Sequence, residues 1–144
     1  MKKHLALTLL ALTTSISHAQ SFQSIRKGLD LYAQIWAEND PAKRAVLMKE
    51  GLTEDFHFMN NRTQSVGHSG FEDFVVSMKS SFPGLVVVFG PLAQHHNVAR
   101  VAWQLRRPDQ SLLAEGFDVL GFDESGKIKS LTGFVGPFNT EIPE

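Results

Sequence analysis

The hydrophobic period changes part-way along this chain of 144 residues. In the first half, apolar residues recur every three or four positions, which is the period of amphipathic helices. In the second half, they gather in runs rich in β-branched and aromatic residues, separated by turn-forming residues, as in strands. Helices followed by strands are typical of an α+β domain, in which the helices cover one face of a curved sheet. We therefore expect an α+β fold with a pocket between its two layers.

Three helices are predicted in the first half of the chain. The first covers residues 21–39, and the second covers residues 41–51 after Asp40, which is a good N-cap. The third covers residues 70–82 and is followed by a Pro-Gly pair, which stops a helix. A short extended segment, residues 55–60, lies between the second and third helices.

The second half predicts four strands joined by short turns. They cover residues 85–89, 95–106, 112–122 and 128–135. Strands that follow one another through short turns form an antiparallel meander, so we expect an antiparallel sheet with one face packed on the helices.

The N-terminus has the pattern of a secretory signal peptide. Two lysines precede an apolar run, residues 5–12, and the small residues Ser17 and Ala19 suit a signal peptidase. The alternative, a membrane anchor, is disfavoured because the run is far shorter than the roughly 20 residues that cross a bilayer. We expect residues 1–19 to be a signal peptide and residues 20–144 a single domain. The protein would then be exported, to the periplasm or outside the cell, without a membrane anchor after processing.

Charge and composition exclude several classes of partner. Without the signal peptide the chain keeps 12 of its 14 Lys and Arg and all 15 Asp and Glu, which gives a net charge near −3. Nucleic-acid binding requires clustered positive charge, so we expect no nucleic acid. The chain has no cysteine and no spaced set of histidines, which argues against a metal site. It also has no phosphate loop or dinucleotide fingerprint, and we expect no cofactor.

Asp118 is the candidate for chemistry in the predicted strand of residues 112–122. It falls in an apolar row, because alternate side chains of a strand share a face. If that face looks inward, desolvation should raise the pKa of Asp118, and the neutral acid could donate a hydrogen bond to a developing oxyanion. Parity alone leaves the opposite orientation open, in which Asp118 pairs with a base at the surface.

Residues 118–128 combine an Asp, an acidic turn and a Gly-Lys-Ile hairpin, and residues 31–40 close the first predicted helix. The first segment resembles a hairpin typical of the nuclear transport factor 2-like superfamily. The second is similar to the first helix of its ketosteroid isomerase and SnoaL-like polyketide cyclase members. The resemblance extends over roughly residues 24–137. It implies a cone-shaped fold in which a curved antiparallel sheet and three N-terminal helices enclose an apolar pocket.

The same resemblance implies roles for three residues. Tyr32 matches the ketosteroid isomerase tyrosine that donates to the substrate oxyanion, and Asp118 matches the neutral aspartic acid beside it. The position of the general-base aspartate is taken by Asn60. An amide accepts no proton near neutral pH, and the loss of a positioned base typically costs roughly 10²- to 10⁴-fold in rate.

A histidine could replace the missing base, since a neutral imidazole is well poised for proton transfer. The candidates are His57, His68, His95 and His96. Adjacent strand residues point to opposite faces, so only one of His95 and His96 can face the pocket. We favour His95 as a catalytic residue at the pocket rim, and a surface role for both is an equal alternative.

Two functions fit these observations. The first is an acid-base enzyme that isomerises, dehydrates or cyclises a small apolar carbonyl or phenolic compound, with Tyr32 and Asp118 holding the oxygen and Asn60 orienting the substrate. The expected pocket lining also includes Phe58, Phe74, Trp103 and Phe134. The alternative is a noncatalytic ligand-binding or assembly module of the same fold, and in either case we expect a homodimer. An epoxide hydrolase is a third possibility, but no water-activating carboxylate with polar neighbours is evident.

Overall fold

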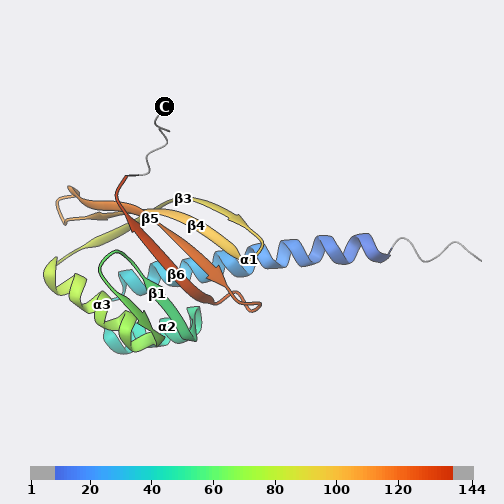
Figure 1. The fold of residues 1–144 in the computed structure, drawn as a ribbon, viewed down its shortest axis with the longest axis horizontal. Helices are drawn as coiled ribbons and strands as arrows, with labels where there is room; N and C mark the ends of the chain where they lie inside the picture. The colour runs from blue at the N-terminus through green and yellow to red at the C-terminus, as the bar shows by residue number, and fades with distance from the viewer. Residues whose placement is uncertain (1–8, 138–144) are drawn as a thin grey trace, which may run out of the picture.

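The computed structural model describes the backbone of residues 9–137 and the side chains of residues 22–137. Its elements are α1 Leu9–Ala37, α2 Pro41–Gly51, β1 Leu52–Met59, β2 Gln64–Val66, α3 Gly67–Ser81, β3 Val86–His95, β4 Val98–Arg106, β5 Leu112–Phe122 and β6 Ile128–Val135. The strands form a curved sheet in the order β2-β1-β6-β5-β4-β3, with the helices gathered on one side of it (Figure 1). The α+β class and the three helices are confirmed. Of the predicted signal peptide, residues 1–8 lie outside the described range and residues 9–19 belong to α1.

The four strands β3 to β6 form the predicted antiparallel meander. The extended segment before α3 is a full strand, β1, and it pairs with β6 in parallel. The complete sheet is therefore mixed. A parallel neighbour is possible here because β1 and β6 are far apart in the chain, so no tight turn has to join them.

The prediction that His95 begins a strand was wrong, because His95 is the last residue of β3. Gly90 and Pro91 resemble strand breakers, but they lie in an irregular stretch where β3 changes its register against β4 and then continues. The turn follows instead at His96, whose positive φ of 50° is a turn conformation.

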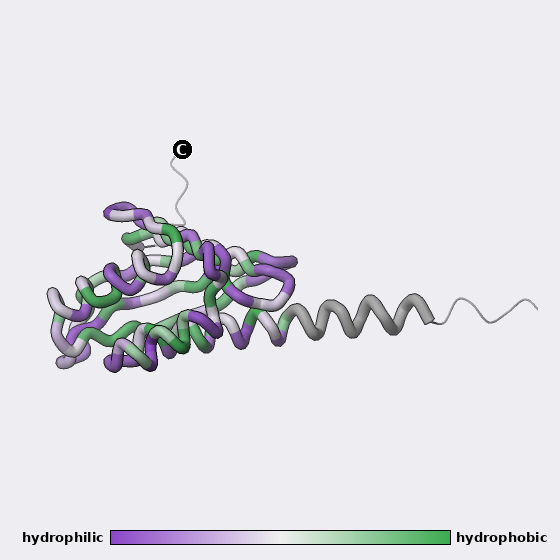
Figure 2. The backbone as a smooth tube through the Cα atoms, turned by 90° about the horizontal axis from the view of Figure 1, so that it is seen from below, coloured by the Kyte–Doolittle hydropathy of each residue, from purple (hydrophilic) through white to green (hydrophobic). Residues whose placement is uncertain are grey.

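The core lies between the sheet and the helices. Its fully buried side chains come from both layers and include Ile35 of α1, Phe71 of α3, Phe56 of β1 and Leu120 of β5. Figure 2 shows hydrophilic residues concentrated at the turns and hydrophobic stretches along the strands and helices. No helix within residues 9–137 is long and apolar enough to span a membrane.

The buried side chain of Arg44 ties the three helices together. Arg44 of α2 is 2% exposed, and its Nε and Nη2 donate to the two carboxylate oxygens of Glu72 on α3 at 2.7 and 2.5 Å. Its Nη1 donates to the carbonyl oxygen of Glu38, directly after α1, at 2.8 Å. A bidentate guanidinium–carboxylate contact is among the strongest charge-assisted hydrogen bonds. Arg44 thus fixes the helical layer that forms one wall of the space beneath the sheet.

Arg44→Ala should lower the free energy of unfolding by about 3 kcal/mol, because it leaves Glu72 without its buried partner. Urea denaturation measures the change. Lys27→Ala is the matched control, since it removes an ion pair with Glu50 in which both side chains are at least half exposed, and it should change stability by less than about 1 kcal/mol. Equal effects of the two substitutions would contradict a structural role for Arg44.

Candidate functional site

A cavity of about 200 Å³ lies between the sheet and helices α1 and α3. Most of its lining is aromatic or aliphatic, and its polar side chains are few. Those with hydrogen-bonding groups are Tyr32, Trp36, Asn60, Asn61, Arg62, Trp103 and Asp118. An apolar cavity with a few converging polar groups is the usual form of a small-molecule site.

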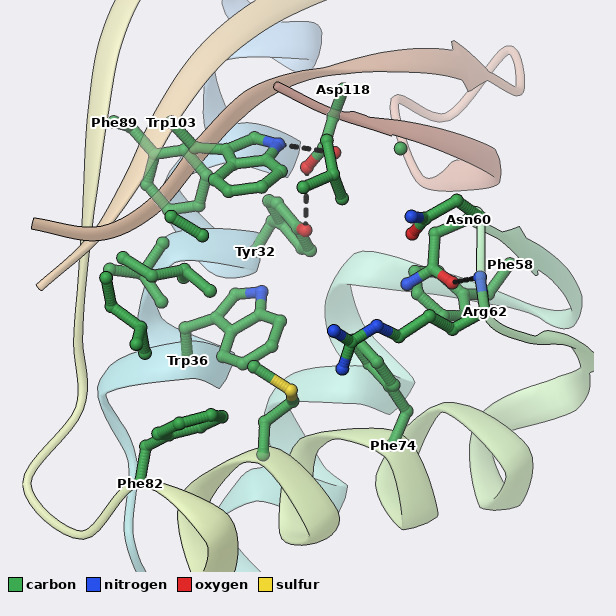
Figure 3. A pocket seen from close by; sticks show the side chains of 18 residues that line it. Tyr32, Trp36, Phe58, Asn60, Arg62, Phe74, Phe82, Phe89, Trp103 and Asp118 are labelled. Carbon is green, nitrogen blue, oxygen red and sulfur yellow. Dashed lines mark hydrogen bonds between the residues drawn. The ribbon is translucent and has the colours of Figure 1, made fainter. Parts of the chain in front are cut away.

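Asp118 is the carboxyl of this cavity. It lies on β5, opposite Val101 of β4 and Gly133 of β6, and is 4% exposed. The Tyr32 hydroxyl donates to its Oδ2 at 2.9 Å and the Trp103 indole Nε1 donates to its Oδ1 at 2.8 Å (Figure 3). Burial raises the pKa of Asp118 to about 6, although the two hydrogen bonds act in the opposite direction.

Tyr32 reaches Asp118 from α1. It is the only tyrosine of the chain and is 3% exposed, with its ring against Phe89 and Phe71. Burial, together with the charge of Asp118, raises the pKa of Tyr32 well above its ordinary value. The hydroxyl therefore keeps its proton and serves as a hydrogen-bond donor.

Trp36 lies one turn further along the same face of α1, because residues four apart in a helix are neighbours. Its indole Nε1 is buried without a hydrogen-bond partner. The indole lies close enough to the Tyr32 hydroxyl to favour the ionised phenol, which offsets part of the rise in the pKa of Tyr32. The cavity thus contains a buried donor that the described residues leave unsatisfied.

Two glycines allow the indole and the carboxyl to lie where they do. Trp103 pairs with Gly116, and a side-chain carbon at Gly116 would lie 2.6 Å from the Trp103 ring. A side-chain carbon at Gly133 would lie 3.1 Å from Oδ1 of Asp118. Position 116 needs glycine, because an added carbon would also lie 2.0 Å from the backbone carbonyl oxygen of Phe134. At position 133 an added carbon would require the Asp118 carboxyl to shift by a few tenths of an ångström.

Asn60 follows β1 and lies beside this group, since the same carbon at Gly133 would be 3.5 Å from the Asn60 Cβ. Its Oδ1 accepts hydrogen bonds from the backbone N–H groups of Arg62 at 2.8 Å and Thr63 at 3.0 Å. This is an Asx-type turn. Its oxygen is committed to the turn, so Asn60 can offer the cavity only its amide N–H donors.

Comparisons with known proteins bear on this arrangement. No family model and no curated protein matches the chain. Among solved structures, a proposed isomerase of the SnoaL-like family from Agrobacterium tumefaciens is 26% identical, covers 80% of this chain and 99% of its own, and has a TM-score of 0.73. A proposed polyketide cyclase from Sinorhizobium meliloti is 15% identical, covers 74% of this chain and 93% of its own, and has a TM-score of 0.61. A proposed ketosteroid isomerase from Kribbella flavida is 16% identical, covers 85% of this chain and 84% of its own, and also has a TM-score of 0.61.

The fold is nuclear transport factor 2-like. Within this nuclear transport factor 2-like domain, six of the eight side chains that the sequence analysis assigns to the site line one cavity. They are Tyr32, Phe58, Asn60, Phe74, Trp103 and Asp118. Segments as distant as α1 and β5 meet there, as the predicted apolar pocket requires.

The structure places the other two elsewhere. Phe134 is 49% exposed and stacks on Phe117 at the outer face of the sheet. Its neighbour Gly133 faces Asp118, so strand parity turns Phe134 outward. His95 is exposed at the end of β3, beside His96 in a separate hollow that Asp123 also lines. Neither His57 nor His68 lines the cavity.

Sequence reasoning missed Trp36 and Arg62. Trp36 could have been found, because it lies four residues after Tyr32 and shares its helix face. Arg62 could not have been found from the sequence. It lies in a turn, and no periodic pattern predicts whether a side chain in a turn points into the domain. Within residues 22–137, no group of three His, Asp or Glu side chains lies close enough together to hold a metal ion.

The raised pKa of Asp118 predicts a pH dependence of stability. The ordinary value is 3.8 and the folded value about 6, so the folded state favours the protonated acid, and its contribution to stability is lost as the pH rises through 6. The free energy of unfolding of the wild type, minus that of Asp118→Asn, should fall by about 2 kcal/mol between pH 4 and pH 7. Urea titrations at several pH values measure this difference. A difference that is constant or rises with pH would contradict the raised pKa.

Proposed function

We propose that this protein is an acid-base isomerase or cyclase that acts on a small apolar carbonyl or phenolic compound. The observation that carries the proposal is Asp118, a 4% exposed carboxyl with a pKa of about 6 in the wall of an apolar cavity. A catalytic group works best when its pKa lies near the working pH. Near neutral pH both forms of Asp118 are accessible, so the residue can accept a proton and return it.

The proposed reaction begins when the Asp118 carboxylate takes a proton from the carbon next to a ligand carbonyl. The electron pair of the broken C–H bond forms a carbon–carbon double bond, and the π pair of the carbonyl moves to its oxygen, which gives an enolate. The same carboxyl then returns the proton to a different atom of the ligand, which completes an isomerisation. Within residues 22–137 Asp118 is the only carboxyl that lines the cavity, so one group serves as both base and acid.

The Tyr32–Asp118 hydrogen bond couples this proton transfer to stabilisation of the enolate. While Asp118 is ionised, the Tyr32 hydroxyl donates to its Oδ2 at 2.9 Å. Once Oδ2 carries the transferred proton, it can donate to the Tyr32 oxygen instead, and the Tyr32 hydrogen can turn to the enolate oxygen. A donor then becomes available as negative charge develops, where such a bond has its greatest catalytic effect.

The size of the cavity limits the ligand. Its volume is about 200 Å³. A cavity of roughly 150 Å³ is enough for benzene, so one ring with a short substituent is the size that fits best.

The presence of Asn60 rather than a carboxylate favours a second candidate function, that of a noncatalytic binding module. Asn60 stands where the resemblance places the general base, and its Oδ1 is committed to backbone N–H groups. A protein of this kind would bind the same compounds without turnover. Measurements of binding and proton transfer on one ligand separate the two candidates.

Export and dimer formation also remain our proposals. Export rests on the basic, apolar and small-residue pattern of residues 1–19. A homodimer would cover the outer face of the sheet, where Phe134 is about half exposed and stacks on Phe117.

The proposed reaction predicts exchange of the hydrogens next to the carbonyl of acetophenone for deuterium in heavy water, followed by NMR. Wild-type protein should accelerate the exchange, and Asp118→Asn should lower the rate by at least roughly 10²-fold, because an amide accepts no proton. Tyr32→Phe should reduce the rate by roughly 10²-fold through loss of the oxyanion donor.

His95→Gln is the control and should exchange at the wild-type rate, since His95 lies outside the cavity. Both tryptophans line the cavity, so quenching of their fluorescence reports binding independently of exchange. Binding without exchange would favour the noncatalytic module. Exchange by Asp118→Asn at the wild-type rate would refute the role of Asp118.

A further inference from the structure

Arg62 brings a positive charge to the cavity that the proposed reaction does not use. It lies in the turn between β1 and β2 and lines the cavity together with Asn60 and Asn61. Figure 3 shows its guanidinium extending into the space beside Phe74 rather than away from the domain. The residue is otherwise exposed, so the charge stays hydrated while the cavity is empty.

The turn that carries Arg62 is held in place. Asn60 Oδ1 accepts the backbone N–H of Arg62 at 2.8 Å and that of Thr63 at 3.0 Å. The backbone N–H of Asn60 donates to the carbonyl oxygen of Thr63 at 2.9 Å. The starting point of the Arg62 side chain is thus fixed against the end of β1, which makes it suitable for holding a ligand in a defined orientation.

No carboxylate within residues 22–137 forms an ion pair with Arg62. Asp118 is the one acidic side chain in the cavity lining, and the causes of its pKa shift are burial and the hydrogen bonds from Tyr32 and Trp103. The charge of Arg62 is therefore not balanced by the protein. A guanidinium remains positively charged at all relevant pH values, and its planar fork matches the geometry of a carboxylate.

We propose that Arg62 binds a carboxylate of the ligand, so that the substrates are small keto acids with one apolar ring. The proposal rests on the proposed function and adds the substrate class to it. The ring would occupy the apolar part of the cavity, the carbonyl oxygen would face Tyr32, and the carbon next to it would face Asp118. The carboxylate would accept hydrogen bonds from the Arg62 guanidinium. One unbalanced positive charge matches a singly charged carboxylate better than a doubly charged phosphate.

The test compares benzoylpropionate, which has a ring, a ketone and a carboxylate, with its primary amide, which has nearly the same shape and no charge. Quenching of Trp36 and Trp103 fluorescence gives the two dissociation constants. Wild-type protein should bind the carboxylate at least about fivefold more tightly than the amide, because Arg62 is exposed and its ion pair is partly screened. Arg62→Gln should reduce this preference to about one.

Two further variants show whether the preference for the acid depends on the fork geometry of Arg62, on its charge alone, or on the net charge of the protein. Arg62→Lys should keep part of the preference, since it retains the charge and loses the fork. Arg26→Gln removes an exposed arginine of α1 that does not line the cavity, and it should keep the full preference. The wild-type preference should also shrink as salt is raised.

Equal binding of acid and amide by the wild type, or a preference that survives in Arg62→Gln, overturns the role of Arg62 and leaves the proposed function intact, because the amide still binds. Failure of both probes to bind at millimolar concentration overturns this proposal together with the ligand class of the proposed function. A preference lost equally in Arg26→Gln and Arg62→Gln also overturns it, since net charge rather than the cavity would then select the acid.

Discussion

The burial of Asp118 beneath the sheet is the constraint on which the rest of the site depends. Transfer of a carboxylate out of water is costly, and the hydrogen bonds from Tyr32 and Trp103 recover only part of that cost. Burial outweighs them, so the carboxyl titrates near pH 6 rather than at its ordinary value of 3.8. A residue in this state changes its charge close to neutral pH, which a surface aspartate does not.

Several features of the fold serve this one group. Glycines at 116 and 133 leave room for the Trp103 indole and the carboxyl, and α1 carries the Tyr32 hydroxyl across to the sheet. The Trp36 donor is buried without a partner, which typically costs roughly 1–3 kcal/mol. Unsatisfied groups of this kind are expected at functional sites, where stability is lower than it could be. The surrounding aromatic core holds the two layers together despite that loss, and the Arg44–Glu72 pair holds the helices to one another.

The sequence predicted the fold well because apolar residues repeat with the period of a helix in the first half of the chain and gather in strand-like runs in the second. The apolar stripe that contains Tyr32 places its side chain on one face of a helix, and the alternation around Asp118 places that side chain on one face of a strand. The family resemblance then indicated that the face of the strand with Asp118 points inward. Phe134 and His95 show where this reasoning fails. For both residues the result depends on strand register, and a shift of one position reverses the face. The irregular stretch at Gly90 and Pro91 moved the β3–β4 turn, and no pattern in the sequence reports such a shift.

Longer-range features were still harder to predict. The parallel pairing of β1 with β6 depends on where the chain returns, and the Arg44–Glu72 pair joins two helices whose charged residues look like ordinary solvated positions. Arg62 reaches the cavity from a turn whose backbone is held by the Asn60 hydrogen bonds, and a turn has no repeat that predicts the direction of a side chain. Such contacts arise from the tertiary arrangement, which a single sequence leaves open.

The central claim is that Asp118 is a buried carboxyl that gains and loses its proton near neutral pH. Carbon-13 NMR of aspartate carboxyl groups, recorded across a pH series on the wild type and on Asp118→Asn, tests it most directly, because the resonance missing from the variant is that of Asp118. The structure predicts that this resonance titrates with a midpoint near 6. A midpoint at or below 3.8 would show an ionised carboxylate throughout the working range and would contradict the account.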